Sequence, residues 1–387
     1  MKIIHIITRL IRGGADENTV ITCIAQADAG HDVTLIYGRD HSIDYVDTIP
    51  DNVRVVCMKE LVREPSPLND MSSIRLLMKL FKAEKPDVVH THTSKAGFVG
   101  RLAAKYAKVP TIIHGVHIVP FENVGTLQKW FYLLAEKFAG RYTDAFINVS
   151  NGTREIYLDH KIGSADQHAV VHSGFDVSKF IDAQPPADWR ERLELAPNAP
   201  KPPTAVMLAA FEPRKRQLEF LRICPSIIEN IPDIQFVFCG EGPDLVRAKA
   251  LVDELGISPN VKFLGFRKDP ETIIAMADVC LLSSQKEGLP RVVMQYLSGN
   301  RPCIMTRLSG IEEVLKHDRN GLIIEPDDFD ALADAVTRFF RDPELRERLS
   351  LGAQQSDLSS WDRSSMQQRT MKAYAMAVDR LKLSTAN

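Results

Sequence analysis

Cysteine is scarce in this sequence, and the few cysteines form no motif. Six occur in 387 residues, no two are close enough for a Cys-x-x-Cys pair, and several stand in apolar runs. We therefore expect reduced core residues of a cytosolic protein. Long apolar runs are also missing, since none reaches the roughly 18 residues of a membrane-spanning helix. The short apolar start is explained better by a buried strand than by a signal peptide, because no small-residue cleavage site follows it.

Charge of one sign is not in excess, and the motifs of several enzyme classes are absent. The net charge of −2 gives no general reason to expect a nucleic acid partner. Gly-x-Gly-x-x-Gly, the fingerprint of dinucleotide-dependent dehydrogenases, is missing. So is Gly-x-Ser-x-Gly, and no cysteine stands in a recognisable histidine environment. These absences fit a transfer reaction that depends on leaving-group stabilisation rather than on a covalent enzyme intermediate.

The sequence does contain a repeated alternation of short apolar runs and helical patterns. A chain of this length exceeds one hydrophobic core, so two domains are expected. The alternation indicates an α/β protein with two Rossmann-like, doubly wound parallel sheets facing a cleft. We predict strands at residues 2–7, 32–38, 53–58, 87–93, 111–117, 145–150, 170–175, 204–210, 234–240, 261–265, 279–284, 302–306 and 321–325.

A Pro- and Ala-rich segment, 184–203, is interpreted as the linker between the two domains. It would separate an N-terminal domain, 1–183, from a C-terminal domain, 204–357. The last stretch, 358–387, is predicted to be helical. Because ligands of open parallel sheets bind outside the carboxyl ends of the strands, the functional residues should follow strands.

Three cations follow a predicted strand in "LAAFEPRKRQLEF". Arg214, Lys215 and Arg216 would together suit a diphosphate, whose negative charge grows as it leaves. The alternative is a solvated helix start.

Glycines precede predicted helices in "TRLIRGGADENTV" and "CGEGPD". Glycine allows backbone N–H groups to come close to a ligand, and a helix N-terminus attracts anions. The alternative at each place is a plain tight turn. The residues concerned are Gly13, Gly14, Gly240 and Gly242.

The segment "EGLP" joins a carboxylate to a turn that leads into a predicted helix. Glu287 is a good acceptor for sugar hydroxyls, and the N–H groups after it suit a phosphate. Gln295 comes eight residues later, close to two helical turns, so it should face the same side. Its amide can bond ribose hydroxyls, but without the assistance of charge. The alternative is an ordinary loop and helix start.

Two segments, "HTHTSKAG" and "HGVH", supply four histidines near predicted strand ends. His90 and His92 alternate along one strand, whereas His114 and His117 lack the i, i+4 spacing of a helical zinc pair. We therefore expect no metal. Hydrogen bonding to a polar substrate is the expected role of one histidine, and a structural role is expected for the other three.

The charge distribution along the chain is uneven. Residues 75–141 contain eleven basic residues against four acidic ones, a surplus of seven in a chain of net −2. The same region contains "QKWFYLLAEKF", with Trp130, Phe131 and Tyr132 in a row. A basic stretch with aromatic residues suits an anionic membrane surface. The alternative is a set of solvated helix faces and a helix that turns its aromatic residues into the core.

The sequence resembles the retaining glycosyltransferases of family 4, because it contains motifs similar to theirs in the same order along the chain. The resemblance covers nearly the whole chain and implies the GT-B fold, with the donor held mostly by the second domain and the acceptor by the first. It also implies a final helix that packs back on the first domain. The "SKAG" block is similar to that of members that build bacterial surface polysaccharides and lipid-linked glycans. The motifs are "IITRLIRGGAD", "HTHTSKAGFVGRLAA", "SGFDVSKF", "FCGEGPD", "VKFLGFRKD", "EGLPRVVMQYLSGNRPCI", "GIEEVLKHDRNGLII" and "SWDRSSMQQRTMKAY".

The resemblance assigns roles to individual residues. It implies that Lys215 binds the diphosphate, that Glu287 meets the donor sugar and that His117 lies near that sugar, so these three are the expected catalytic residues. Further donor contacts are expected from Gly13, Gly14, Arg214, Arg216, Gly240, Gly242, Phe266, Arg267, Gly288, Leu289, Pro290 and Gln295. Contacts on the acceptor side are expected from His92, Ser94 and Lys95.

Two positions depart from the family's pattern. Ala210 stands where an arginine is expected, and Gln295 replaces the second glutamate of the motif that begins at Glu287. Arg214 or Arg216 would have to supply the missing cation. The departures leave two alternatives open, a weakened or inactive pseudo-glycosyltransferase that binds a nucleotide or partner, and a nucleotide-sugar epimerase of the same fold.

The sequence therefore predicts a retaining glycosyltransferase. It would move a sugar from a nucleotide-diphosphate donor, with UDP the expected nucleotide, to a glycan acceptor that can be lipid-linked, in bacterial polysaccharide or lipopolysaccharide synthesis. Because lysine and arginine would carry the diphosphate charge, neither a metal nor another cofactor is expected. We expect a cytoplasmic protein, peripheral at the inner face of the membrane where its basic region meets an anionic surface.

Overall fold

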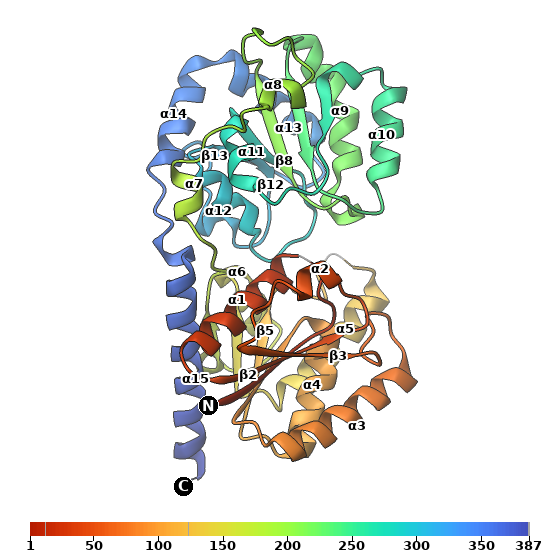
Figure 1. Cartoon of the computed structure of the whole chain (residues 1–387), viewed down its shortest axis with the longest axis vertical. Helices are drawn as coiled ribbons and strands as arrows, with labels where there is room; N and C mark the ends of the chain where they lie inside the picture. The colour runs from red at the N-terminus through yellow and green to blue at the C-terminus, as the bar shows by residue number, and fades with distance from the viewer. Residues whose placement is uncertain (12, 123, 386–387) are drawn as a thin grey trace. The chain divides into compact units, whose positions relative to one another are not determined.

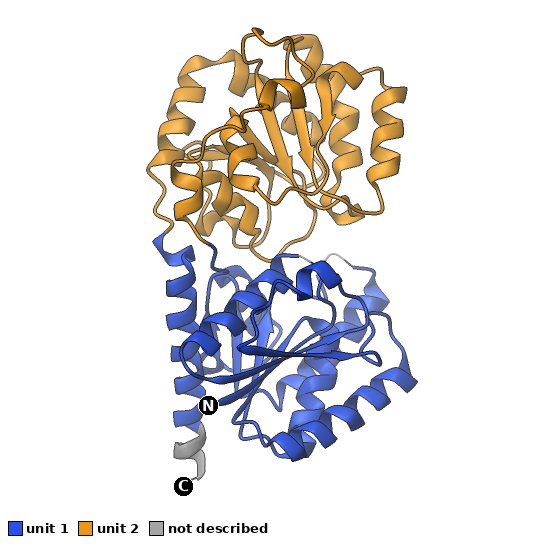
Figure 2. Cartoon of the chain, viewed as in Figure 1, with its two compact units in different colours: residues 1–175, 359–387 blue, residues 176–358 orange. Residues whose placement is uncertain are grey.

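The chain forms two compact units. The computed structural model describes residues 1–11, 13–122 and 124–385 (Figure 1). Unit 1 contains residues 1–175 and the C-terminal segment from residue 359, and unit 2 contains residues 176–358 (Figure 2). The first change of unit thus falls at residue 175, earlier than the expected domain limit at residue 183.

Unit 1 is built on a seven-stranded parallel sheet in the order β3-β2-β1-β4-β5-β6-β7. Helices connect successive strands and cover both faces, which is why the strands are continuous apolar runs. The strands are β1 (Lys2–Ile7), β2 (Asp32–Gly38), β3 (Val53–Met58), β4 (Val88–His92), β5 (Thr111–Val116), β6 (Ala145–Asn148) and β7 (His168–Val170). The helices are α1 (Gly14–Asp28), α2 (Ile43–Val46), α3 (Pro67–Glu84), α4 (Ser94–Ala107), α5 (Thr126–Gly140), α6 (Asn151–Asp159) and α15 (Arg363–Thr385), with 3-10 turns η1 (Ala165–Gln167) and η5 (Ser359–Trp361).

The last strand of unit 1 corrects the prediction of a strand at 170–175. β7 ends at Val170, and the following residues leave the sheet. Gly174 lies against Met366 of α15, and Phe175 pairs with the segment just before that helix. The apolar run is therefore buried by the C-terminal segment rather than by a strand neighbour.

α15 packs on α1, β5 and β6 of unit 1. Met366, Ala373, Tyr374 and Ala377 are buried in one core cluster with strand residues. Their spacing places them on one face of a helix, so α15 buries one apolar face against unit 1.

Unit 2 is built on a six-stranded parallel sheet in the order β10-β9-β8-β11-β12-β13. The strands are β8 (Thr204–Leu208), β9 (Gln235–Cys239), β10 (Val261–Phe263), β11 (Val279–Leu282), β12 (Cys303–Thr306) and β13 (Gly321–Ile324). The helices are α7 (Ser178–Ile181), α8 (Trp189–Arg192), α9 (Gln217–Asn230), α10 (Leu245–Glu254), α11 (Pro270–Met276), α12 (Arg291–Ser298), α13 (Phe329–Arg341) and α14 (Pro343–Gln354), with 3-10 turns η2 (Pro213–Lys215), η3 (Ser258–Asn260) and η4 (Ile311–Glu313).

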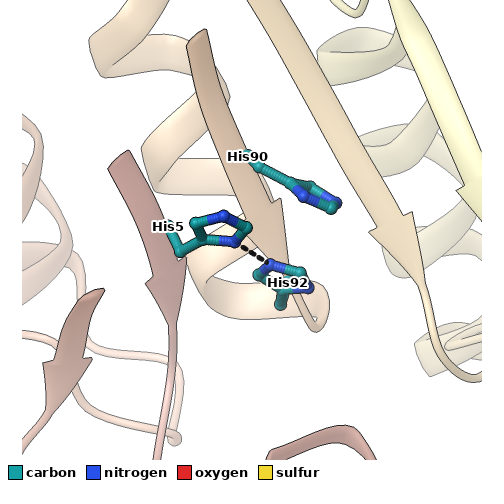
Figure 3. Close-up of side chains that lie close together, drawn as sticks. All are labelled: His5, His90 and His92. Carbon is teal, nitrogen blue, oxygen red and sulfur yellow. Dashed lines mark hydrogen bonds between the residues drawn. The ribbon is translucent and has the colours of Figure 1, made fainter. Parts of the chain in front are cut away.

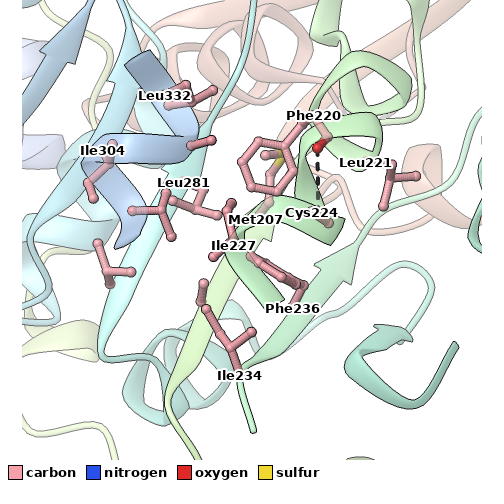
Figure 4. Close-up of a cluster of buried hydrophobic side chains, with 14 of the residues drawn as sticks. Met207, Phe220, Leu221, Cys224, Ile227, Ile234, Phe236, Leu281, Ile304 and Leu332 are labelled. Atoms are coloured by element: carbon pink, nitrogen blue, oxygen red, sulfur yellow. Dashed lines mark hydrogen bonds between the residues drawn. The ribbon is translucent and has the colours of Figure 1, made fainter. Parts of the chain in front are cut away.

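The core of unit 2 packs α9, together with α13, against the sheet. Phe220, Cys224 and Ile227 recur along α9 at the spacing of one helical face and are fully buried (Figure 4). They belong to the same cluster as Met207 of β8 and Phe236 of β9 (Figure 4). This packing fixes the ends of β8 and β9, from which loops of the candidate site emerge.

The segment expected to be a linker, 184–203, belongs to unit 2. Glu194 forms an ion pair with Lys262 of β10 at 2.5 Å, and Lys201 forms one with Asp278 at 2.5 Å. The proline-rich composition therefore marks an irregular segment fixed to unit 2 rather than a free connection.

Both sheets reverse their strand order once, between β1 and β4 in unit 1 and between β8 and β11 in unit 2. Ligands of doubly wound folds bind at the carboxyl ends of the strands at such a point. Among the residues that the structure describes, no helix has the length and apolar content needed to span a membrane. Five of the six free cysteines are buried as expected, but Cys57 is exposed because it lies on the edge strand β3.

Candidate active site

A carboxylate and two cations meet at the switch point of unit 2. Lys215 ends the 3-10 turn after β8, and Glu287 lies in the loop after β11. Lys215 Nζ forms an ion pair with one oxygen of Glu287, and Arg214 Nη1 lies 2.9 Å from the other. The structure thus brings together three residues that the sequence predicted for one donor site.

Hydrogen bonds between loops hold this arrangement. The Ser283 hydroxyl donates to the backbone carbonyl of Lys215 at 2.8 Å, and the Gln285 N–H donates to the carbonyl of Arg214 at 2.8 Å. Thr306 Oγ1 donates to the Ser284 carbonyl at 2.7 Å, which adds the end of β12. The loops after β8, β11 and β12 therefore form one bonded layer.

The helix after Glu287 is fixed by a buried tyrosine. Tyr296 Oη accepts a hydrogen bond from the Leu208 N–H at 2.8 Å and donates to the Leu281 carbonyl at 3.3 Å. It ties α12 to the ends of β8 and β11, the two strands at the switch point. Gly288, Leu289 and Pro290 are buried before this helix, and Gln295 is half-buried within it.

The charges in this cluster support one another. Burial alone would raise the pKa of the Glu287 carboxyl, but Lys215 and Arg214 outweigh burial and hold that pKa below its ordinary value of 4.5. Burial likewise disfavours the charge on Arg214, but Glu287 and Glu212 outweigh it and raise the pKa of the guanidinium. The cluster therefore pairs two cations with two carboxylates, Glu287 and Glu212, and a ligand diphosphate would compete with these carboxylates for both cations.

The structure separates Arg216 from this cluster. Its backbone is left-handed, with φ of 57°, and its guanidinium forms an ion pair with Asp327. The guanidinium carbon also lies 4.8 Å from the centre of the Phe329 ring. Of the two candidates for the cation that Ala210 lacks, Arg214 is the one that contacts Glu287.

The glycines of "CGEGPD" have a packing role in unit 2. Gly240 and Gly242 have φ of 150° and 151°, and a Cβ on either would collide with a carbonyl oxygen of the loop after β8, at Ala209 and Phe211. They allow the loops after β8 and β9 to pack backbone to backbone.

The remaining predicted donor contacts of unit 2 follow β10. Phe266 is 44% exposed, and the Arg267 guanidinium forms two hydrogen bonds with Asp269, of 2.9 and 2.7 Å. Arg267 is thus oriented by a neighbouring carboxylate.

In unit 1, four histidines and a glutamine lie near the switch point. His5 of β1 is the register partner of His90 on β4, and His92 follows on the same face (Figure 3). His5 Nε2 lies 2.8 Å from Gln26 Oε1, and His5 Nδ1 lies 2.9 Å from His92 Nε2. His92 Nδ1 lies 2.9 Å from His117 Nε2.

This hydrogen-bonded chain fixes the tautomers of its members. The Gln26 oxygen can only accept, so His5 carries its proton on Nε2 and accepts at Nδ1. His92 then donates from Nε2 and accepts at Nδ1, and His117 donates from Nε2. His117 is left with an unprotonated Nδ1, a hydrogen-bond acceptor that suits a substrate hydroxyl.

Burial keeps the histidines of this cluster neutral. It lowers the pKa of His5 and of His117 to about 4, against an ordinary value of 6.5, although the bond to Gln26 works in the opposite direction at His5. The pKa values of His90, His92 and His114 are also lowered by burial. Neutral imidazoles both donate and accept, so this group can bind hydroxyls but supplies no positive charge at pH 7.

Two buried polar atoms line a small cavity beside the chain. His90 Nδ1 bonds the Tyr374 hydroxyl at 2.7 Å, whereas His90 Nε2 and Asn18 Oδ1 have no partner among the described residues. Both residues border a cavity of about 20 Å³, together with His92 and His117. A cavity of this size accepts a group no larger than water.

A metal is the other ligand that these side chains could hold. His5, His90 and His92 each offer a nitrogen, and the three atoms lie within 4.8 Å of one another. Two of these histidines are hydrogen-bonded to each other, and each already has a further hydrogen-bond partner. The expectation of no metal therefore stays a prediction.

The predicted glycine loop of unit 1 has little steric reason to be glycine. Gly13 precedes α1 with extended backbone, and a Cβ on Gly14 would meet no atom within 4 Å. The first turn also contains Asp16, which accepts a hydrogen bond from the Ile11 N–H at 2.9 Å. Burial raises the pKa of Asp16 to about 6.

On the acceptor side, Ser94 and Lys95 form the first turn of α4, directly after β4. Lys95 Nζ lies 2.5 Å from Asp70 of α3, so its charge is already paired. Thr93 before them has φ of 62°, and its hydroxyl bonds that of Thr8 at 2.8 Å. This turn is therefore bonded to Thr8, the residue that directly follows β1.

Sequence reasoning missed several of these residues. His5 had a usable signal, since a histidine inside an apolar strand must find a buried partner. Tyr374, Gln26 and Asn18 gave none, because they lie on helices whose packing brings them to β1 and β4. Ser283 and Tyr296 bond backbone groups, and the Ser284 hydroxyl donates to Glu287 at 3.3 Å, contacts that no motif records.

Solved structures share this architecture over the whole chain. Anabaena HepE in complex with UDP-glucose is 20% identical, has a TM-score of 0.78, and the match covers 97% of this chain and 99% of that one. The lipopolysaccharide outer core galactosyltransferase WaaB is 18% identical, with a TM-score of 0.66 and coverage of 97% and 99%. Two Rossmann-like parallel-sheet units of this kind define the GT-B fold, which this chain therefore has.

Sequence comparisons identify the family. Residues 12–179 match the family described as Glycosyltransferase Family 4, and residues 190–356 match Glycosyl transferases group 1. The UDP-Gal:alpha-D-GlcNAc-diphosphoundecaprenol alpha-1,3-galactosyltransferase of Escherichia coli is 34% identical, and the match covers 78% of each chain. The capsular polysaccharide biosynthesis glycosyltransferase CapM of Staphylococcus aureus is 24% identical over 74% of this chain and 76% of its own. The chain belongs to the family 4 glycosyltransferases and is a glycosyltransferase.

Proposed function

We propose that this glycosyltransferase is a retaining enzyme that moves a sugar from a UDP-sugar to a lipid-linked glycan acceptor in bacterial surface polysaccharide synthesis, lipopolysaccharide included. The observation that carries the proposal is the pairing of Lys215 and Arg214 with Glu287 at the switch point of unit 2. Two cations there suit a diphosphate leaving group, and the carboxylate suits sugar hydroxyls. The name of the E. coli relative supports the UDP donor and the diphosphoundecaprenol-linked acceptor.

In the proposed reaction, the acceptor hydroxyl attacks the anomeric carbon from the side of the departing diphosphate. The bond between that carbon and the diphosphate oxygen breaks, the new glycosidic bond forms, and the hydroxyl proton passes to the leaving phosphate. Lys215 and Arg214 stabilise the charge that develops on the diphosphate. Since both charges come from side chains, we propose transfer without a metal ion.

The lipid-linked acceptor also sets the proposed location. A polyprenyl-linked substrate stays at a bilayer, so the enzyme would work as a peripheral protein at the cytoplasmic face of the membrane. The basic region that contains α3 to α5 supports contact with an anionic leaflet.

The first test is thermal unfolding of the protein with UDP, GDP, ADP and their sugar conjugates. We expect UDP-sugars to raise the unfolding temperature and the other bases to leave it unchanged. Release of UDP on addition of a GlcNAc-diphosphate-lipid, with NMR of the product showing a retained anomeric configuration, would complete the proposal. A shift without transfer to any acceptor would favour the pseudo-glycosyltransferase, which Ala210 and Gln295 also suggest. The absence of a shift with any nucleotide would reject the donor site.

A further inference from the structure

Helix α5 has a second apolar face, turned away from the core of unit 1. Leu127 is 86% exposed, Trp130 57%, Phe131 60% and Leu134 62%. These positions are spaced i, i+3, i+4 and i+7, so the side chains lie along one line on the helix. We call these four residues the α5 stripe.

The buried face of the same helix lies opposite the α5 stripe. Leu133, Glu136 and Ala139 are buried against unit 1. A surface helix normally carries polar residues opposite its core face, as α13 does with Asp330 and Asp334. A contiguous line of four large exposed apolar side chains is the usual mark of a binding surface rather than of solvent contact.

The charged residues that α5 itself places beside the stripe are of one sign. Arg141, which directly follows the helix, is exposed and Lys137 is half-buried, and at about 100° per residue both lie on the side of the stripe. Glu136 is the single acid in the α5 sequence, and its carboxylate is buried in an ion pair with Arg101 at 2.8 Å. The outward surface of α5 therefore combines apolar side chains with positive charge alone.

We propose that the α5 stripe and its flanking cations form a docking surface for an anionic lipid bilayer. Tryptophan and phenylalanine enter the boundary between headgroups and acyl chains, while lysines and arginines meet the lipid phosphates. A second copy of the chain is a poorer occupant, because a two-fold contact through α5 would place Lys137 and Arg141 near their own copies without an acid of α5 to pair with.

The place of α5 in unit 1 gives the docking surface a use. Helix α5 is the next helix after β5, and α4, which begins with Ser94 and Lys95, is the next helix after β4. The first turns of both helices therefore lie at the carboxyl edge of the sheet. Docking through α5 would keep that edge near the bilayer surface. Delivery of a lipid-linked acceptor to this edge rests on the proposed function, whereas membrane binding itself rests on α5 alone.

Flotation of the full chain with vesicles tests the proposal. We expect the wild-type protein to float with vesicles of phosphatidylcholine and phosphatidylglycerol in equal parts at low salt, and to stay behind with pure phosphatidylcholine. The double variant Trp130→Ser, Phe131→Ser should lower the partition coefficient at least about tenfold. Leu351→Ser, which removes an exposed leucine of unit 2, should leave the partition coefficient unchanged.

A charge variant separates the two parts of the surface. Lys137→Gln with Arg141→Gln should weaken binding to the anionic vesicles and reduce its dependence on salt. Circular dichroism and the unfolding temperature should match the wild type in every variant, because the altered side chains are exposed or half-buried.

Two results would overturn the docking surface. One is wild-type protein that fails to float with anionic vesicles at low salt. The other is a dimer in light scattering without lipid that the Trp130→Ser, Phe131→Ser variant converts to a monomer, which would make α5 a contact between copies. Transfer to a water-soluble acceptor that lacks the lipid is measured in parallel. Loss of flotation with that transfer intact supports the surface, and absent transfer with intact flotation rejects the proposed function alone.

Discussion

The two switch points of this molecule have the same topology, but one is lined by neutral side chains and the other by charged ones. In unit 1, the region between β1 and β4 holds neutral imidazoles that bond one another and whose pKa values are lowered by burial. In unit 2, the region between β8 and β11 holds the ion pairs that Lys215 and Arg214 form with Glu287, and these cations hold the pKa of the Glu287 carboxyl below its ordinary value. One fold thus presents a hydrogen-bonding surface in one unit and an ionic one in the other.

The difference shows that the fold places a site but does not choose its chemistry. Parallel strands with helices on both faces bring loop residues to the carboxyl edge of each sheet. Which ligand suits that edge depends on the few side chains present there and on their burial. Neutral histidines suit hydroxyls, and paired lysine and arginine suit phosphates.

Removal of the central cation of unit 2 should have the largest effect. Lys215→Ala should lower the rate of sugar transfer by about 10² or more, because an interaction with developing negative charge is lost. Arg214→Gln should lower it more than Arg216→Gln, since Arg216 pairs with Asp327 instead of Glu287. Initial rates of UDP release with saturating acceptor provide the measurement.

Lys201→Ala is the matched control for Lys215→Ala. It breaks another lysine–carboxylate pair of unit 2, with Asp278, and should change the rate by no more than about twofold. Transfer by Lys215→Ala within about tenfold of the wild type would contradict the diphosphate role.

Acid should act on the neutral cluster of unit 1. The folded-state pKa of His5 is about 4 and its ordinary value is 6.5, so the unfolded chain binds the extra proton between these values. The free energy of unfolding should therefore fall as the pH drops from 6.5 towards 4, by about 3 kcal/mol from His5 alone. Urea unfolding at a series of pH values measures this slope.

His5→Gln should remove part of that slope while keeping a hydrogen-bonding side chain. His41→Gln, which replaces an exposed histidine bonded to the Arg39 carbonyl, should leave the slope as it is. An acid slope that is the same in His5→Gln and in the wild type would rule out a neutral buried His5.

The smallest effect is expected from restoring the acid that the family pattern places on α12. Gln295→Glu replaces a neutral hydrogen bond by a charge-assisted one, which is stronger by about 1 kcal/mol. The KM for the donor should fall by roughly fivefold, with kcat nearly unchanged. An unchanged KM would show that position 295 does not contact the donor.

Much of the fold could be predicted from the sequence, because a buried parallel strand is a short apolar run wherever it stands. Twelve of the thirteen predicted strands overlap observed ones over most of their length. The run at 170–175 failed because an apolar run shows that a segment is buried but not what buries it. Here α15 replaces a strand neighbour.

The candidate site was predictable in part for a similar reason. Lys215 and Glu287 each follow a strand, and the carboxyl-edge rule was enough to place both at one sheet edge. The choice between Arg214 and Arg216 was not predictable, because it depends on the left-handed backbone at Arg216 and on the ion pair with Asp327. The sequence also left open whether the aromatic residues of α5 face a membrane or the core. The exposure of Trp130 and Phe131 in the folded structure shows that they do not face the core.

The sequence by itself determined that this protein has two parallel-sheet units and that cations and a carboxylate follow strands of the second unit. The periodicity of apolar residues and the order of elements along the chain are enough for this, because both can be read from short segments. Only the tertiary structure decided that His5, His92 and His117 form a hydrogen-bonded chain from Gln26, and that Tyr374 of the last helix bonds His90. Those contacts join residues far apart in the chain, and their tautomers and pKa values follow from burial, which no short segment records.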